Sequence, residues 1–242
     1  MDKKKISGKQ KQFFTEGGIL IDLHTHTIHS DGELLPSELI QRARKKGYRA
    51  IGLTDHADSS NLETVIKSLK NACRDMNAAY QDIICAAGVE LTHIPPVLAA
   101  KMVRKARKLG AEIIVFHGET VTEPVEPGSN LAAIKAKADI LAHPGRITPA
   151  EARLAAKNGV YLEITARNGH NVTNAHVAKT AMAAGAKLIF NTDTHTPQNM
   201  ADKAQRRRVL RSAGLKDSGI ARIIKNSEEL LEKKGFLIRK ST

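Results

Sequence analysis

Residues that commonly bind metal ions follow one short apolar segment after another along this sequence. In the stretch ILIDLHTHTIHSDG at residues 19–32, three histidines and two aspartates surround the first such segment. The residues of this kind that end or follow the later segments are His56, Glu90, His117, His143, Asp193 and His195. Burying His, Asp and Glu is costly unless they are paired or bound to a cation. Their recurrence therefore predicts a shared metal site.

The spacing of two of these groups suits ligands of a single ion. Alternate residues of a strand share a face, so both imidazoles of His24-x-His26 can reach the same ion. Asp193-x-His195 repeats this spacing. Imidazole and carboxylate ligands without thiolates favour Zn, Mn or Fe. Because the ligands are too many for one tetrahedral ion, we expect two to three divalent metal ions.

Seven short apolar runs alternate with helix-like segments and would position these side chains. The runs occupy residues 19–23, 50–54, 83–89, 112–116, 139–143, 160–164 and 187–192. Their nearly continuous hydrophobicity is typical of parallel strands buried on both faces. The alternation predicts an α/β fold with a closed or nearly closed barrel, whose strands end on one rim. A doubly wound open sheet is the alternative, although the sequence has neither a Gly-x-Gly-x-x-Gly motif after its first strand nor a Walker loop.

The ordered set of motifs resembles the PHP (polymerase and histidinol phosphatase) family. It comprises His24-x-His26, Ser30-Asp31-Gly32, Thr54-Asp55-His56, Gly88-Val89-Glu90, His117, Ala142-His143-Pro144-Gly145 and Asp193-x-His195. Together these motifs span about residues 20–200, which is most of the chain. The resemblance implies a distorted (β/α)7, TIM-like barrel of the PHP fold, and a phosphoesterase with three metal ions.

The family pattern also implies which side chains hold each ion. It gives the first ion His24, His26 and Asp193, the second His117 and His143, and the third Asp31, His56 and His195, with Glu90 bridging the first two. Some family members have a histidine in place of Asp31, and His29 is the competing ligand here. We favour Asp31 because the Ser-Asp-Gly form matches the family pattern.

The expected reaction follows from two ions that lie close together. They would bridge a hydroxide, which attacks phosphorus in line, and they would take up charge on the phosphoryl oxygens. Among the ligands, we expect Glu90, His143 and Asp193 to be catalytic. Three further acids are not counted as ligands. Asp22 and Asp55 are interpreted as structural groups that orient imidazoles, and Glu163 as a structural acid at the end of a strand.

The substrate is expected to be a small phosphate ester. Histidinol phosphate is the candidate that the name of the resembled family suggests. Arg167 and His170, and with less weight Arg146, are predicted to contact the phosphate, since arginine suits bidentate phosphate binding. His29 is a further candidate contact. An exonuclease or phosphodiesterase acting on nucleic acid is the alternative, and an inactive scaffold is a third reading. Residues 206–208, three consecutive arginines, favour nucleic acid, whereas the aromatic content of 3% leaves few rings for base stacking.

The charge of +13 is concentrated at the two ends of the chain. Residues 203–242 hold twelve lysines and arginines against four acids, and residues 1–18 hold five lysines against two acids. We therefore expect a basic tail at 1–18, a PHP domain at 19–205, and a basic helical extension at 206–242 packed on or next to the barrel.

The expected location is the cytoplasm. The N-terminus lacks the apolar region of a secretory signal, and no apolar run approaches the roughly 18 residues of a membrane span. Cys73 and Cys85 lie far apart and match no metal-ligand spacing, so no disulfide is expected, which favours a reducing compartment. The sequence does not predict an oligomeric state.

Overall fold

Residues 18–238 are described by a computed structural model. Seven parallel strands form its central sheet in the order β1-β2-β4-β5-β6-β7-β8. They are β1 (Leu20–Asp22), β2 (Tyr48–Leu53), β4 (Ile84–Leu91), β5 (Ile113–His117), β6 (Ile140–Ala142), β7 (Tyr161–Thr165) and β8 (Leu188–Asn191). A short additional strand, β3 (His56–Ala57), pairs with β4. Because neighbours in the sheet are consecutive along the chain, the predicted TIM-like barrel is confirmed and the doubly wound sheet is wrong.

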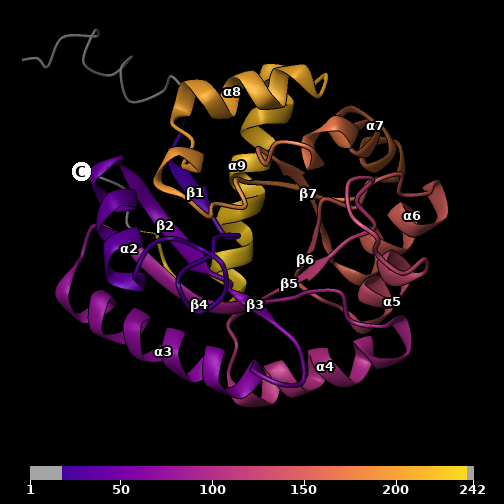
Figure 1. Cartoon of the computed structure of the whole chain (residues 1–242). Helices are drawn as coiled ribbons and strands as arrows, with labels where there is room; N and C mark the ends of the chain where they lie inside the picture. The colour runs from indigo at the N-terminus through magenta and orange to yellow at the C-terminus, as the bar shows by residue number, and fades with distance from the viewer. Residues whose placement is uncertain (1–17, 239–242) are drawn as a thin grey trace, which may run out of the picture.

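Helices alternate with the strands and surround them (Figure 1). They are α2 (Pro36–Lys45), α3 (Leu62–Ala79), α4 (Pro96–Leu109), α5 (Ser129–Ala136), α6 (Pro149–Asn158), α7 (Asn174–Ala184), α8 (Lys203–Ser212) and α9 (Asp217–Lys233). Proline begins α4 and α6, where its fixed φ suits the first turn. Gly110 and Gly159 end these two helices in the left-handed region, with φ of 90° and 72°. None of the described helices combines the length and hydrophobicity that crossing a membrane requires.

The seam between β1 and β8 is closed differently from the rest of the barrel. Near the carboxyl ends of the strands, Thr25 and Thr194 form an isolated parallel bridge. The His26 amide donates to the Thr194 carbonyl at 2.8 Å. Beside it, the Leu23 amide donates to Asn191 Oδ1 at 2.8 Å. These bonds bring the residues that follow β1 next to those that follow β8.

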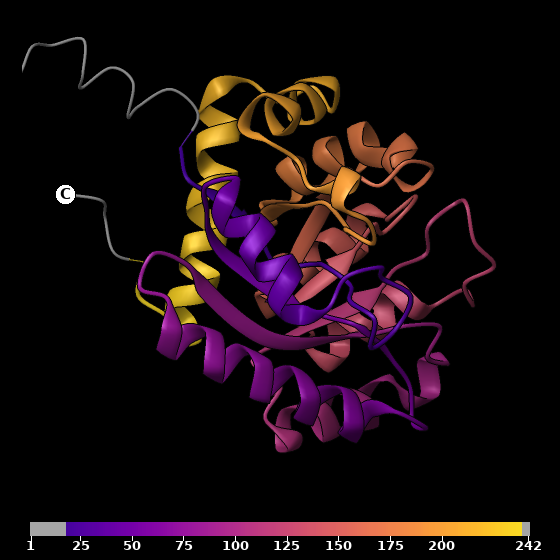
Figure 2. The ribbon, with the colours of Figure 1, turned by 60° about the vertical axis from the view of Figure 1, so that its left-hand side comes forward.

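Helix α9 covers the other end of this seam. It contacts both β8 and β1, and it runs along the side of the barrel (Figure 2). Asn226 Nδ2 of α9 donates to the Leu188 carbonyl at 2.7 Å. Leu230 and Leu231 are buried among inward-facing strand residues. The chain therefore folds well beyond residue 205, and the predicted division at that position stays a prediction. The predicted tail at 1–18 lies outside the described residues except for Gly18.

The interior of the barrel has an apolar half and a polar half. Along β5, the inward positions are Ile113, Val115 and His117, as the two-residue period of a strand requires. Along β7, Tyr161 is followed inward by Glu163. Isoleucine, valine, alanine and the leucines of α9 fill the amino-terminal half. A packed apolar layer therefore lies directly beneath the polar side chains at the carboxyl ends of the strands.

The two cysteines contradict the prediction that no disulfide forms. Cys73 of α3 and Cys85 of β4 are bonded, with their Cα atoms 5.1 Å apart. The reason is that α3 packs directly on β4, so residues separated by 12 positions meet across a helix–strand contact. The expectation of a reducing compartment rested on unpaired cysteines and loses that basis.

We predict that replacing Leu231 with Ala will destabilise the barrel. Leu231 is fully buried, and removing a buried leucine side chain typically costs about 2–5 kcal/mol. Chemical denaturation measures this change, with Leu237→Ala as the control because Leu237 is 78% exposed. A loss for Leu231→Ala no larger than that of the control would contradict the role of α9 in closing the barrel.

Candidate metal centre

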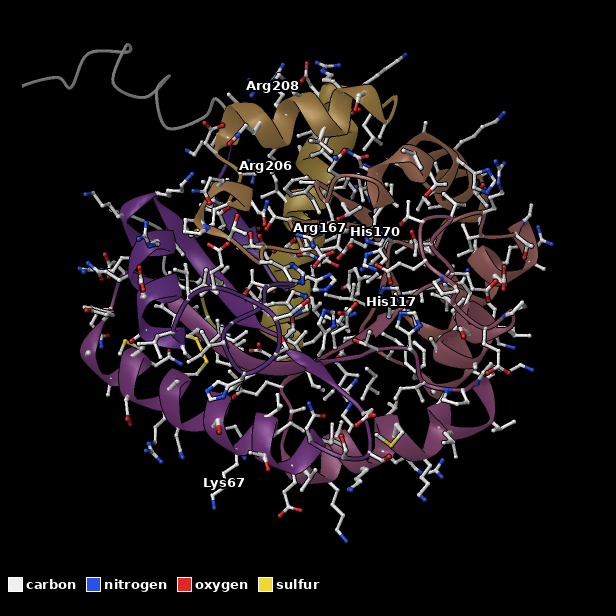
Figure 3. The ribbon with its side chains drawn as sticks, viewed as in Figure 1. Lys67, His117, Arg167, His170, Arg206 and Arg208 are labelled. Atoms are coloured by element: carbon white, nitrogen blue, oxygen red, sulfur yellow. A yellow bond between two sulfur atoms is a disulfide. The ribbon has the colours of Figure 1, made fainter. Side chains whose placement is uncertain are left out.

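The carboxyl ends of the strands bring the predicted ligands into one cluster. The residues that contribute are His24 and His26 after β1, His56 in β3, Glu90 in β4, His117 in β5, His143 after β6, and Asp193 and His195 after β8. Most of them are buried. Four of them, His56, His117, Asp193 and His195, line a cavity of about 210 Å³ in the rim. His117, Arg167 and His170, which also line it, are labelled in Figure 3. The structure thus gathers from many strands the side chains that the sequence singled out.

Two of these residues have an unusual backbone conformation. His143 has a φ of 25° and Asp193 a φ of 53°, and non-glycine residues adopt such values mainly where the surroundings impose them. The turn after His143 is completed by Gly145 at a φ of 59°, where a Cβ would lie 1.8 Å from the Glu119 carbonyl oxygen. The glycine of the His-Pro-Gly motif is therefore required by the bend that follows β6.

The first group of ligand atoms comes from β1, β4 and β8. Asp193 Oδ1 lies 3.1 Å from His26 Nε2 and 3.8 Å from His24 Nε2. Glu90 Oε1 lies 3.3 Å from His24 Nε2. Donor atoms that share one tetrahedral zinc at about 2.0–2.1 Å lie roughly 3.3 Å from each other. The three residues His24, His26 and Asp193 therefore have the spacing of ligands around one ion.

Buried polar atoms at the rim lack the hydrogen bonds that burial normally demands. Within the described residues, six such atoms lack a partner in hydrogen-bond geometry, although some of them lie within 3.1–3.3 Å of each other. They are His24 Nε2, His26 Nδ1, His26 Nε2, Glu90 Oε1, His143 Nε2 and Asp193 Oδ1. An unsatisfied buried polar group typically costs about 1–3 kcal/mol. Oxygen and nitrogen lone pairs that converge in this way match the donor set of a divalent metal, so the residues present fit the implied ions.

Two further groups complete the set. Glu90, His117 and His143 each offer an atom within 4.8 Å of the others. On the opposite side, Asp31 Oδ1 lies 3.4 Å from His56 Nε2 and 3.2 Å from His195 Nε2. These are the two remaining groups that the family pattern implies.

Asp31 and His29, the two candidate ligands of the third ion, lie in the same loop but in different surroundings. Asp31 contacts two histidines of the cluster, whereas His29 is exposed and does not line the cavity among the described residues. Ser30 and Thr27 hold this loop through hydrogen bonds to the Asp55 carboxylate at 2.7–2.9 Å. The geometry supports Asp31 as the ligand and gives no support to a substrate contact by His29.

The three additional acids orient the site in different ways. Glu163, which the sequence marked only as a structural acid of a strand, contacts two imidazoles: its Oε2 lies 2.8 Å from His24 Nδ1 and its Oε1 lies 3.3 Å from His143 Nδ1. Asp22 accepts hydrogen bonds from the amides of His24 and Thr192 rather than from an imidazole. Since Asp55 also binds amides and hydroxyls, the idea that these two aspartates orient imidazoles is wrong, and both fix the backbone instead.

Charge in the cluster is balanced between carboxylates and imidazoles. Burial disfavours the ionised form of Glu90, but His24 and His56 hold the pKa of this carboxyl well below its usual range. Burial likewise disfavours protonated His24, but Glu163, Glu90 and Asp193 hold its pKa well above the usual value. Burial lowers the pKa of His26 to about 4. The carboxylates are therefore ionised and the imidazole of His26 is neutral, which are the states that bind metals, whereas His24 holds a proton that a metal ion would have to displace.

The predicted phosphate contacts divide into two that reach the cavity and one that does not. Arg167 and His170 line it, and Arg167 Nε lies 3.9 Å from Asp193 Oδ2. His170 Nδ1 is within 2.7 Å of Thr120 Oγ1, which sets the direction of the ring. Arg146 is exposed and lies outside the residues that line the cavity, so the structure gives no support to a contact from it.

Sequence reasoning missed Glu123, which reaches over the cavity from the segment after β5. Its Oε2 lies 3.1 Å from His117 Nε2 and 3.2 Å from His93 Nε2. Its Oε1 lies 3.2 Å from His170 Nε2. The segment 118–128 contains three glutamates, and nothing in their spacing indicates which one turns inward. His93, Glu123 and His117 together form another set of atoms close enough to hold a cation.

Comparisons with known sequences give a consistent set of relatives. A family model described as PHP domain matches residues 22–118. An uncharacterized protein of Methanocaldococcus jannaschii is 50% identical, covering 80% of this chain and 89% of that protein. A probable phosphatase of Shewanella pealeana is 28% identical, covering 88% and 90% respectively. The DNA polymerase/3'-5' exonuclease PolX of Bacillus subtilis is 26% identical over 77% of this chain but only 36% of that protein.

One solved structure with a similar fold is that of a named phosphatase. Histidinol phosphate phosphatase from Lactococcus lactis, in complex with zinc, L-histidinol and phosphate, matches with a TM-score of 0.58. The match covers 81% of this chain and 94% of that chain, at 17% identity. At that identity the likeness concerns the fold alone.

We predict that chelation will lower the thermal stability of the protein and that metal will restore it. A ligand present at about 100 times its Kd stabilises by about 2.7 kcal/mol, which for a domain of this size is a shift of at least about 5 °C. Metal analysis should find two to three equivalents in the protein, and fewer in Glu90→Gln. Glu126→Gln is the control, since Glu126 is exposed. Absence of bound metal before chelation would contradict the assignment.

Proposed function

The chain belongs to the PHP domain family, and on this premise we propose that it hydrolyses phosphate esters with divalent metal ions. Membership confirms the resemblance drawn from the motifs. The observation that carries the proposal is the convergence of buried imidazole and carboxylate atoms without hydrogen-bond partners at the rim of the barrel. The relative named a probable phosphatase supports the same class of reaction.

We assign the ions to the three groups of side chains described above. His24, His26 and Asp193 would hold the first ion, His117 and His143 the second, and Asp31, His56 and His195 the third, with Glu90 shared by the first two. When bound, such ions stabilise charge on a phosphoryl group and lower the pKa of a water molecule for attack. We propose zinc, manganese or iron, two to three per chain.

The remaining residues of the cavity would bind and orient the substrate. Arg167 carries a fixed positive charge at the rim and can donate two N–H groups to phosphate oxygens. Burial lowers the pKa of His170 to about 4, so its imidazole is neutral at physiological pH and acts as a hydrogen-bond partner. Glu163 keeps the rings of His24 and His143 in place, which preserves the positions of two ligands.

A nucleic-acid substrate is the second candidate. The observation that favours it is the similarity to the polymerase and exonuclease of Bacillus subtilis over 77% of this chain. A small phosphorylated substrate remains the first candidate, because the relative named a probable phosphatase matches over nearly its whole length. The two candidates differ in whether the phosphate to be cleaved is a monoester or a diester.

We predict that the metal-loaded protein will hydrolyse p-nitrophenyl phosphate or bis-p-nitrophenyl phosphate. The Asp193→Asn substitution removes a buried anion that faces two imidazoles, so kcat/KM should fall by at least about 100-fold. Asp75→Asn is a matched control, because Asp75 is an exposed residue of α3.

The rate of 4-nitrophenolate release measures both activities, and circular dichroism checks that each variant is folded. Activity on the monoester alone would identify a phosphatase, and activity on the diester would support a nuclease. Lack of hydrolysis with zinc, manganese and iron, or full activity in Asp193→Asn, would contradict the proposed function.

A further inference from the structure

A second cavity adjoins the metal cavity on the side of α8. Its volume is about 310 Å³. The residues that line it are Ala166, Arg167, Asn168, Thr192, Gln198, Asn199, Ala201, Gln205, Arg208 and Val209. Arg167 lines both cavities, so its guanidinium lies at the boundary between them. Figure 3 shows Arg167 between the arginines of α8 and the histidines of the metal cavity.

The chemistry of this lining suits an anion. Among the described residues that line the cavity, two are arginines, four carry carboxamides and none is acidic. The metal cavity differs in this respect, since Asp31, Glu123 and Asp193 line it. Arginine with neutral hydrogen-bond donors is the combination that recognises phosphate oxygens. None of the described residues that line the second cavity contributes a carboxylate that would repel a negative charge.

The arginines of α8 show that Arg208 is available for a ligand. Arg206 is buried and donates to the Ile19 carbonyl at 2.6 Å. Arg207 and Arg211 both pair with Asp217, at 2.7 and 2.6 Å. Within the described residues, Arg208 makes no ion pair or hydrogen bond, and it is exposed at the edge of the cavity. One member of the arginine triplet thus retains its donors for a partner outside the protein.

Asn199 joins the two cavities. Its Oδ1 accepts hydrogen bonds from Arg167 Nη1 at 3.4 Å and from the amide of His195 at 3.1 Å. His195 belongs to the metal cluster, and Asn199 lines the second cavity. The position of Arg167 is therefore tied to the same loop that carries a metal ligand. A substrate that spans the boundary would meet donors on both sides of it.

We propose that this second cavity binds another phosphate group of the substrate, one that belongs to the same molecule as the phosphate being cleaved. The inference rests on the proposed function, because it identifies a substrate class for the same metal site. Substrates of this class carry a second phosphate in addition to the one that is cleaved. A small bisphosphate and a short nucleic acid share that chemistry, and the experiment separates them.

The test compares Arg208→Gln with the wild-type protein on two matched pairs of compounds. One pair is fructose 6-phosphate and fructose 1,6-bisphosphate, and the other is thymidine 5′-monophosphate and the 5′-phosphorylated thymidine dinucleotide. Losing one charge-assisted contact should raise KM about tenfold for the compound with two phosphates. The KM for the partner compound with one phosphate should stay within about twofold. The pair that shows this effect identifies the source of the second phosphate.

Lys203→Gln is the control variant, because it removes one positive charge from the same helix outside the cavity lining. It should leave KM unchanged for all four compounds. Equal effects of Arg208→Gln on both members of each pair, or no effect on either, would overturn the inference.

Calorimetry separates a failure of this inference from a failure of the proposed function. If the wild-type protein hydrolyses none of the four compounds, the phosphoesterase proposal fails for this substrate class. The dissociation constants of the same compounds still test the cavity. Binding of a two-phosphate compound about tenfold weaker in Arg208→Gln supports it, and equal dissociation constants refute it.

Discussion

The burial of carboxylates in the mouth of the barrel is the constraint on which the rest of this structure depends. Glu90, Glu163 and Asp193 are almost completely screened from solvent, and ionised groups in such surroundings need positive charge or N–H donors. Imidazoles on neighbouring strands supply part of that requirement. Atoms such as Glu90 Oε1 and His143 Nε2 are left without hydrogen bonds, which is the deficit that metal ions would remove. The packed apolar layer beneath these polar side chains includes Leu231 of α9, and it keeps the strand ends in place.

The parts of the fold and site that could be predicted from the sequence are those governed by local patterns. A buried parallel strand is recognisable as a short apolar run, and a barrel brings the ends of all such strands to one rim. His117 could therefore be placed near His143 without knowledge of the helices between them. The period of two along a strand then explains why His117 points inward above Val115.

The parts that could not be predicted depend on contacts between segments with no pattern in common. The bond between Cys73 and Cys85 requires the packing of α3 on β4, and the position of Glu123 requires the path of an irregular loop. In the arginine triplet of α8, Arg206 donates to the Ile19 carbonyl, Arg207 pairs with Asp217, and Arg208 lines the second cavity, which only the three-dimensional structure shows. In the sequence alone the three arginines cannot be told apart, because each adds the same positive charge.

Anomalous X-ray scattering from crystals of the metal-loaded protein, recorded at the absorption edge of the bound metal, tests the central claim most directly. The account predicts two or three peaks at the rim of the barrel. One peak should lie among His24, His26 and Asp193, and another between His117 and His143. A map with no anomalous peak at the rim, from protein shown to contain metal, would contradict the metal centre and the hydrolytic function built on it.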